Sequence, residues 1–323
     1  MFEKEIFIWC CDLNKNSGEG IIASKFINDL KLYNSNYKLK ICSPKNKKGN
    51  VLIERFVYPL IGLLYLWKIY LFTKNKKICY VNYLPFWNFV LFLLLPPKTI
   101  LGPITGGSLF MKKPFTNYFV RKYLLNFLYY LSSLIIKIKG TNLLFSTDLL
   151  KNKFKKNNKH YFNYVLKDLK IKKIFNPKKY DLIFYLRDHK NKNIQLQINL
   201  ANKLSKKFKI VTVGKNIQNY NIKNFGYIKR EKLMKILKET KFAFLSPENL
   251  YSFFALDSIN CNTNIFFNKY ENYKNSAIKG IYFVRYEDTN KLYVEVKKQL
   301  MKKFVFIIKH KPYRKKFKNY FRL

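Results

Sequence analysis

Residues Phe242 to Phe267 read FAFLSPENLYSFFALDSINCNTNIFF. The apolar run at 242–246 predicts a strand, 254–260 has the apolar spacing of a helix, and 265–267 predicts a second strand. Two strands joined through a helix run parallel in the same sheet. This stretch therefore predicts one strand–helix–strand unit of a parallel sheet.

The same alternation continues on both sides of this unit. Further strands are predicted at 5–11, 37–43, 78–82, 99–102, 143–146, 181–186, 209–213 and 224–226. Further helices are predicted at 21–32, 51–73, 86–95, 117–137, 147–154, 193–206, 229–240 and from 290 onward. Regular alternation of this kind indicates an α/β fold with parallel, doubly wound sheets.

The chain has 323 residues, which favours two domains. After Lys155 the composition shifts to Lys and Asn, and no helix or strand period returns until Tyr180. We therefore expect Rossmann-like domains at 1–165 and 180–305, a linker at 166–179, and a basic C-terminal helix or tail at 306–323. A cleft between two such domains would bind a nucleotide-like ligand at the carboxyl ends of the strands.

The formal charge is +45, from 63 basic and 18 acidic residues. Only seven of the basic residues are Arg, the residue that best reads phosphates and guanines, so we expect no nucleic-acid partner. An anionic membrane surface fits this charge better. The Lys-rich end of the chain is then either a lipid anchor or a solvated helix.

Five cysteines occur without a CxxC spacing or a neighbouring His cluster, which is typical of reduced thiols in a cytoplasmic protein. We expect no metal site. The apolar stretches 56–72 and 83–95 are interrupted or too short to span a bilayer, and they predict either interfacial segments or core helices. The expected location is the cytoplasm, with peripheral attachment to the inner face of the plasma membrane as a further expectation.

Several polar stretches follow predicted strands. Gly18 and Gly20 lie between a strand and a helix, where glycine lets the backbone approach a ligand, although a simple tight turn explains them as well. Arg187 and Lys192 follow the strand at 181–186 and suit a diphosphate, or else form a solvated basic turn. The glycine-rich stretch 102–107 also follows a strand.

Two acids accompany these cations. Glu248 lies in the loop after the strand at 242–246, and Asp257 lies in the first turn of the next predicted helix. Ionised carboxylates are strong acceptors for sugar hydroxyls. In the alternative interpretation Asp257 stabilises the helix dipole and Glu248 is an ordinary loop acid.

The order of these parts resembles the donor half of GT-B glycosyltransferases, and within them glycosyltransferase family 4, the retaining group that includes glycogen synthases and bacterial mannosyltransferases. The matching positions are Gly226, the helix at 229–240, Ser246-Pro247, Glu248, Ser252-Phe253-Phe254, Asp257 and Cys261 to Asn264. The second acid is Asp where the family usually has Glu, and eight residues separate the two acids where the family has seven. Asn82 or Tyr83 stands at the strand end where many relatives carry a His.

The resemblance implies a GT-B fold, with two Rossmann-like domains whose parallel sheets face a central cleft. It implies that Arg187 and Lys192 hold the diphosphate, that Asp257 meets the ribose and that Glu248 faces the transferred sugar. Glu248, Arg187 and Lys192 would be catalytic. The donor site would also include Gly18, Gly20, Tyr251 and Ser252.

The implied activity is transfer of a hexose-like sugar from a nucleoside-diphosphate sugar, with retention and without a metal or other cofactor. The implied acceptor is a cell-surface glycan, such as lipopolysaccharide, capsule or a polyprenyl-linked oligosaccharide. The altered acid spacing motivates an alternative, a non-catalytic GT-B-like protein that binds a glycan or a partner enzyme.

Overall fold

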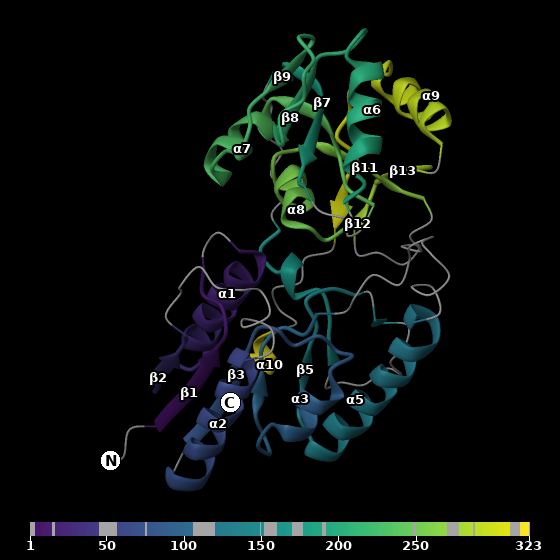
Figure 1. Ribbon diagram of the computed structural model, residues 1–323. Coiled ribbons are helices and arrows are strands. Elements are labelled where there is room, and N and C mark those ends of the chain that lie inside the picture. The colour runs from purple at the N-terminus through teal and green to yellow at the C-terminus, as the bar shows by residue number, and fades with distance from the viewer. Residues whose placement is uncertain are drawn as a thin grey trace. The chain divides into compact units, whose positions relative to one another are not determined.

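The structure of the protein is a computed structural model, which describes residues 4–14, 17–44, 57–74, 76–105, 120–148, 150–151, 160–169, 177–188, 192–247, 250–269, 278–286, 288–310 and 317–322. The chain divides into two compact units (Figure 1). Unit 1 comprises Met1–Lys167 and Tyr313–Leu323, and unit 2 comprises Asp168–Pro312. Unit 1 is thus assembled from two separate parts of the chain.

Unit 1 contains a four-stranded parallel sheet in the order β2-β1-β3-β4. Its strands are β1 (Lys4–Cys10), β2 (Tyr37–Cys42), β3 (Lys76–Val81) and β4 (Ile100–Leu101). A separate parallel pair joins β5 (Leu143–Leu144) to β6 (His160–Tyr161). The run IFIWC of β1 is buried throughout, as expected for a central parallel strand that is covered on both faces.

Successive side chains of β1 point to opposite faces of the sheet and belong to two separate hydrophobic cores. Ile6 and Ile8 pack with α1 (Gly18–Tyr33) and α10 (Lys318–Phe321). Phe7 and Trp9 pack with the helices of the other face. Those helices are α2 (Tyr58–Phe72), α3 (Phe89–Leu94) and α5 (Leu125–Lys139), the last preceded by a π-helical turn at Val120–Leu124.

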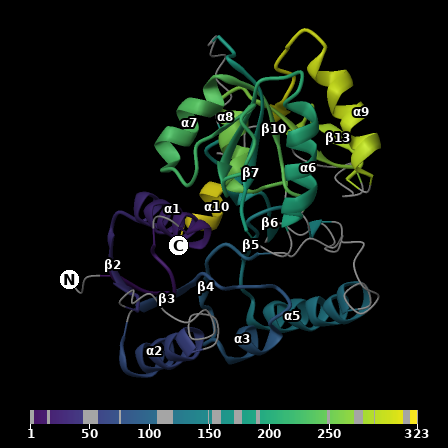
Figure 2. The same ribbon diagram turned by 45° about the horizontal axis from the view of Figure 1, so that its top comes forward.

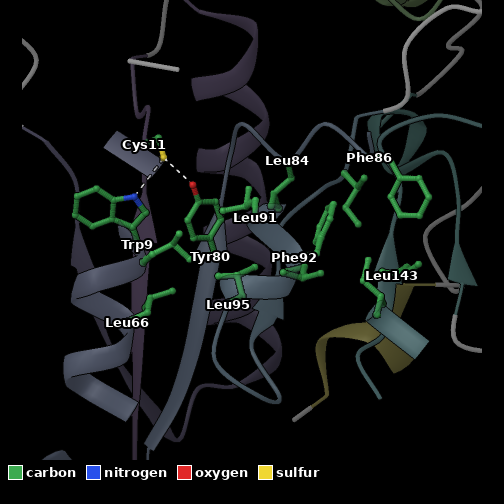
Figure 3. Packing of buried hydrophobic residues seen from close by; sticks show 14 of the residues in the cluster. Trp9, Cys11, Leu66, Tyr80, Leu84, Phe86, Leu91, Phe92, Leu95 and Leu143 are labelled. Carbon is green, nitrogen blue, oxygen red and sulfur yellow. Dashed lines mark hydrogen bonds between the residues drawn. The ribbon is translucent and has the colours of Figure 1, made fainter. Parts of the chain in front are cut away.

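The core under α2 and α3 is aromatic and contains few polar atoms (Figure 3). Trp9 Nε1 donates a hydrogen bond to Cys11 Sγ at 3.2 Å, and that sulfur lies 3.5 Å from the hydroxyl of Tyr80. These polar atoms contact one another, and apolar packing determines the rest of this half of the unit. None of the described helices is both long and apolar enough to cross a membrane.

The sequence predicts a basic helix or tail at 306–323, and the last part of this segment belongs to unit 1. Phe317, Tyr320 and Phe321 are buried in the core beneath α1, and the ring of Phe321 stacks on Tyr33 with centroids 5.6 Å apart. Lysines dominate the composition of the segment, but its aromatic residues set its position, because their burial outweighs the solvation of the flanking charges. Earlier in the segment, β14 (Lys309–His310) pairs with β12 (Ile278–Lys279) in unit 2.

Unit 2 contains a six-stranded sheet in the order β13-β11-β10-β7-β8-β9, in which every pairing is parallel. Its strands are β7 (Tyr180–Leu186), β8 (Ile210–Gly214), β9 (Ile222–Asn224), β10 (Thr240–Phe244), β11 (Asn264–Asn268) and β13 (Tyr282–Val284). Helices α6 (Ile194–Leu204) and α9 (Thr289–Leu300) pack together on one face. On the other face α7 (Arg230–Lys238) packs against α8 (Phe253–Asn260) (Figure 2).

Both units therefore confirm the predicted α/β class with parallel, doubly wound sheets. Most predicted strands agree with the observed ones to within two residues. The helix predicted at 86–95 is shorter, because Asn88 caps it: its side-chain oxygen accepts from Leu91 N at 3.2 Å and begins α3 at Phe89.

Candidate functional site

The strand order of unit 2 reverses next to β7. The chain adds β8 and β9 on one side of β7 and then crosses to place β10 and β11 on the other. The loops that leave the carboxyl ends of β7 and β10 therefore diverge, and this is where parallel sheets bind ligands. Arg187 follows β7, and Ser246 and Pro247 follow β10.

Arg187 is exposed at this edge and forms no ion pair with any carboxylate of the described residues. Its neighbour Asp188 pairs with Lys215 at 3.3 Å. Lys192 is half-buried at the start of α6, where its carbonyl accepts a hydrogen bond from Gln197 Nε2 at 2.7 Å. The two predicted diphosphate ligands thus stand at the end of β7 and at the beginning of α6.

Gly214 draws the ends of β7 and β8 together. Its backbone is left-handed, with φ of 99°, and a Cβ atom there would come within 2.2 Å of the carbonyl oxygen of Leu186. The next residue, Lys215, donates its backbone N–H to that same oxygen at 2.8 Å. Glycine is required at this position for the close approach of the two strand ends beside Arg187.

Ser252 begins α8. Its backbone is extended and its hydroxyl accepts from Ala255 N at 3.3 Å, which is the geometry of an N-cap. Tyr251, the residue before it, is buried. Both lie on the connection between β10 and α8, in the loop where the sequence predicts the donor site, but their contact with a donor stays a prediction. Glu248 lies outside the described residues.

The expectation that Asp257 occupies the first turn of its helix is wrong. Helix α8 begins at Phe253, so Asp257 lies in its second turn, and no acid occupies the first. It therefore does not interact with the positive end of the helix dipole. The side chain is 3% exposed, which for a carboxylate requires a charged partner.

Arg230 is that partner, and sequence reasoning missed it. Its Nε donates to Asp257 Oδ2 at 2.8 Å and its Nη2 donates to Oδ1 at 2.6 Å, so the pair is bidentate. The guanidinium also lies over the ring of Phe253, 5.7 Å from its centroid. Hydrogen bonding to Asp257 raises the pKa of Arg230. The scarcity of Arg in a Lys-rich chain is the signal that could have identified it.

In unit 1 the strand order also reverses, between β1 and β3. Asn82 and Tyr83 follow β3 with left-handed backbone, at φ of 71° and 45°. Cys10 Sγ donates to Asn82 Oδ1 at 2.7 Å, and Asn82 Nδ2 donates to the carbonyl of Glu19 at 2.8 Å. Asn82 thereby joins the ends of both strands to the beginning of α1, and such strained backbone is typical of functional sites.

The loop before α1 is held by a cap. Ser17 is the N-cap of α1, and its hydroxyl accepts from Gly20 N at 2.8 Å. Gly20 is buried, and a Cβ atom there would approach the carbonyl oxygen of Asn14 to 2.2 Å. Gly18 is exposed at the first position of the helix. Gly20 is therefore required for packing of the loop, whereas the proximity of either glycine to donor phosphates stays a prediction.

Solved structures with the same arrangement of elements identify the fold. One is the UDP-GlcNAc 2-epimerase of Methanocaldococcus jannaschii in complex with UDP-GlcNAc and UDP, with a TM-score of 0.55, 14% identity, and coverage of 98% of this chain and 97% of that chain. The chain has the GT-B fold. Sucrose-phosphate synthase of Thermosynechococcus elongatus gives a TM-score of 0.52 and 12% identity over 92% of this GT-B chain and 90% of its own.

No protein-family model and no curated protein matches the sequence. The comparisons therefore support the GT-B fold, and the resemblance to family 4 stays a prediction. Among the residues that the structure describes, no three His, Cys, Asp or Glu side chains gather as a metal site. Metal-independent chemistry also stays a prediction.

Proposed function

We propose that this GT-B protein is a glycosyltransferase that uses a nucleoside-diphosphate sugar. One observation carries the proposal: the strand-order reversal of unit 2 puts Arg187, free of any described carboxylate, at the edge where β7 and β10 diverge. Ligands of parallel sheets bind at such points. The epimerase with this fold was solved with UDP-GlcNAc and UDP, and we extend that ligand class to this chain.

In the proposed reaction, Arg187 and Lys192 neutralise the diphosphate as the bond to the sugar breaks. Cations fixed before the reaction stabilise the charge that develops on the leaving group and need no reorganisation. The exposed guanidinium at the end of β7 supplies two parallel donors for phosphate oxygens. Glu248 would contact the transferred hexose, and transfer would proceed with retention and without a metal.

We assign the acceptor to unit 1, at the reversal between β1 and β3. The left-handed residues Asn82 and Tyr83 stand there beside the loop before α1. The amide of Asn82 is buried and bonded to Cys10 and Glu19, so it positions this loop. The half-buried phenol of Tyr83 suits sugar hydroxyls, for which it serves as both donor and acceptor. The proposed acceptor class is a cell-surface glycan: lipopolysaccharide, capsule or a lipid-linked oligosaccharide.

Nucleotide binding tests the donor part of this proposal. We expect one of UDP, GDP and ADP at 1 mM to raise the melting temperature by about 2–4 °C, as a Kd near 0.1 mM would give. A labelled sugar from the matching donor should then enter a lipid or glycan fraction. If none of the three nucleotides changes the melting temperature at millimolar concentration, the donor site is wrongly assigned.

The Arg230–Asp257 pair favours a second candidate, a non-catalytic GT-B-like protein that binds a glycan or a partner enzyme. Both oxygens of the acid expected at the ribose are already bonded to Arg230. The two candidates differ in cells. If the double variant Glu248→Ala and Asp257→Ala leaves glycan synthesis unchanged while the protein still binds glycan, the non-catalytic function is correct.

A further inference from the structure

The helices that cover one face of the unit 1 sheet carry apolar side chains toward solvent as well as toward the core. Helices α2, α3 and α5 cover the sheet with one side, yet large apolar side chains stay exposed on their other side. We call this outer surface the apolar face and define it by Leu64, Trp67, Leu71, Leu93, Phe127 and Ile138. Exposure reaches 73% for Leu64 and 77% for Ile138. Exposed apolar surfaces made of several large side chains mark sites of interaction with proteins or membranes.

Helix α2 is apolar on all sides except at Lys68, although only one side is covered. The exposed residues recur at helical spacing along one stripe: Leu60, Leu64, Trp67 and Leu71. Leu63 and Leu66 lie toward the sheet and are buried in the core. An all-round apolar helix belongs in a core or in lipid. The outer stripe of α2 therefore needs an apolar environment that the described residues do not provide.

Helix α5 repeats this arrangement. Its exposed stripe consists of Tyr123, Phe127, Tyr130, Leu134 and Ile138, and begins in the π-helical turn. Tyr129 and Ile136, on the opposite side, belong to the core. The inner side of α5 thus packs into the core, whereas its outer stripe stays exposed.

Two hydrogen bonds join the three helices into one layer. Trp67 Nε1 of α2 donates to the carbonyl of Leu94 at 2.7 Å, and Lys139 Nζ of α5 donates to the carbonyl of Leu93, also at 2.7 Å. Both carbonyls are at the end of α3, which lies between α2 and α5 in both views (Figures 1 and 2). The stripes are therefore neighbours on one surface.

The charges around the apolar face select its partner. No Asp or Glu occurs between Glu54 and Asp148, whereas Lys and Arg recur throughout this part of the sequence. Lys68 of α2 and Lys137 of α5 are exposed beside the stripes. A second copy of the chain would bring two cationic surfaces together, which is unfavourable. Anionic lipid headgroups complement the lysines, and Trp and Tyr side chains suit the layer between headgroups and acyl chains.

We propose that the apolar face of unit 1 docks on an anionic lipid bilayer, with the side chains of α2, α3 and α5 inserted at the interface. The interaction combines apolar burial with attraction between lysines and lipid headgroups. It uses helices between residues 58 and 139, in contrast to the basic tail, whose aromatic residues are buried in unit 1. The proposal is independent of the nucleotide donor and of catalysis.

Vesicle flotation tests the proposal. The full chain is mixed with vesicles of phosphatidylcholine alone or with 30% phosphatidylglycerol, and bound protein is measured after centrifugation. We expect binding to the anionic vesicles, and a loss of at least about ten-fold for the double variant Leu64→Glu and Ile138→Glu, because each substitution puts a carboxylate at the lipid-facing surface. The control Tyr220→Glu and Val294→Glu adds the same charge at exposed sites of unit 2 and should bind as the unmodified chain does.

Tryptophan fluorescence gives a second readout. Trp67 and Trp87 are exposed and Trp9 is buried, so brominated lipids should quench the first two only, and Trp67→Phe should remove part of the quenching. If the Leu64→Glu and Ile138→Glu variant floats as well as the unmodified chain does, the proposal is overturned. The overall positive charge would then be enough for binding to anionic vesicles. Absence of flotation would overturn it too. A dimer in solution that this variant converts to a monomer would identify a second copy as the partner.

Discussion

Arg230 binds both carboxylate oxygens of Asp257, and so connects the beginning of α7 to the second turn of α8. The carboxylate is buried, but the guanidinium is about half exposed, with 52% of its side chain accessible. A ligand can therefore reach the cation of this pair more easily than the anion. Any donor contact at this point would involve Arg230 before Asp257.

Asp257→Asn should lower the free energy of unfolding by about 1–2 kcal/mol, because a buried charge-assisted bond is lost while the half-exposed Arg230 regains water. Urea unfolding measures this change. Glu231→Gln is the control, since it removes one exposed acid from α7, the helix that carries Arg230. In a double-mutant cycle with Arg230→Met, additive effects would show that the two residues do not interact.

Arg187→Gln should weaken binding of the nucleoside diphosphate about ten- to a hundred-fold and leave the melting temperature unchanged. One charge-assisted contact is worth about 1.5–3 kcal/mol, and this side chain is exposed and contributes no packing. Calorimetric titration is the measurement. Lys206→Gln removes one charge in the turn before β8, at the amino ends of the parallel strands. This variant should bind the nucleotide as the unmodified protein does. Equal weakening by both variants would indicate a diffuse charge effect.

Gly20→Ala should destabilise unit 1 by more than about 1 kcal/mol. In an ordinary helix this substitution stabilises by about 0.5–1 kcal/mol, but here the added Cβ would lie 2.2 Å from the carbonyl oxygen of Asn14. Gly140→Ala is the comparison, because φ there is 64° and no atom lies within 4 Å of the added carbon, so only backbone strain opposes it. Thermal unfolding separates the two. A stabilised Gly20→Ala variant would show that the loop moves freely.

The thiols should be unreactive in the folded protein. Burial raises the pKa of Cys11 and of Cys261 to about 11, so at pH 8 only about one in a thousand is a thiolate. Iodoacetamide at pH 8 should therefore modify the half-buried Cys42 first. Mass spectrometry after timed quenching identifies the modified residue. Rapid modification of Cys11 would contradict its burial.

The same shifts make stability depend on pH. The unfolded thiols lose their protons near pH 9, whereas the folded ones keep them to about pH 11. The folded state then binds more protons than the unfolded state, and stability falls as the pH rises through this window. Urea unfolding at pH 8 and pH 10 measures the fall, and Cys261→Ala should reduce it.

Phe321→Ala should cost about 3–5 kcal/mol of unit 1 stability, because the ring is fully buried beneath α1 and stacks on Tyr33. Arg322→Ala, at the exposed neighbouring position, should cost little. Differential scanning calorimetry resolves the effect on unit 1. Unchanged melting of the Phe321→Ala variant would show that α10 is not part of the core.

The sequence pattern was sufficient for the parallel sheets, since buried strands such as β1 and β10 are continuous apolar runs bounded by polar turns. It was not sufficient for the pairing of Arg230 with Asp257, which are 27 residues apart and meet only when α7 packs on α8. The position of Phe321 was equally hidden, because lysines dominate the local composition. Strand ends can be predicted from local pattern, but a charge's partner depends on packing between helices.

Unit 2 lies between the two parts of unit 1 along the chain, so unit 1 can be completed only after unit 2 has been synthesised. Strand β1 emerges from the ribosome early, but the residues that fill the core beneath α1, Phe317 to Phe321, are added only after all of unit 2. Unit 2 is contiguous and can fold while the chain is still growing. The apolar surface of α1 then stays uncovered through most of synthesis, a period in which a chaperone would bind it.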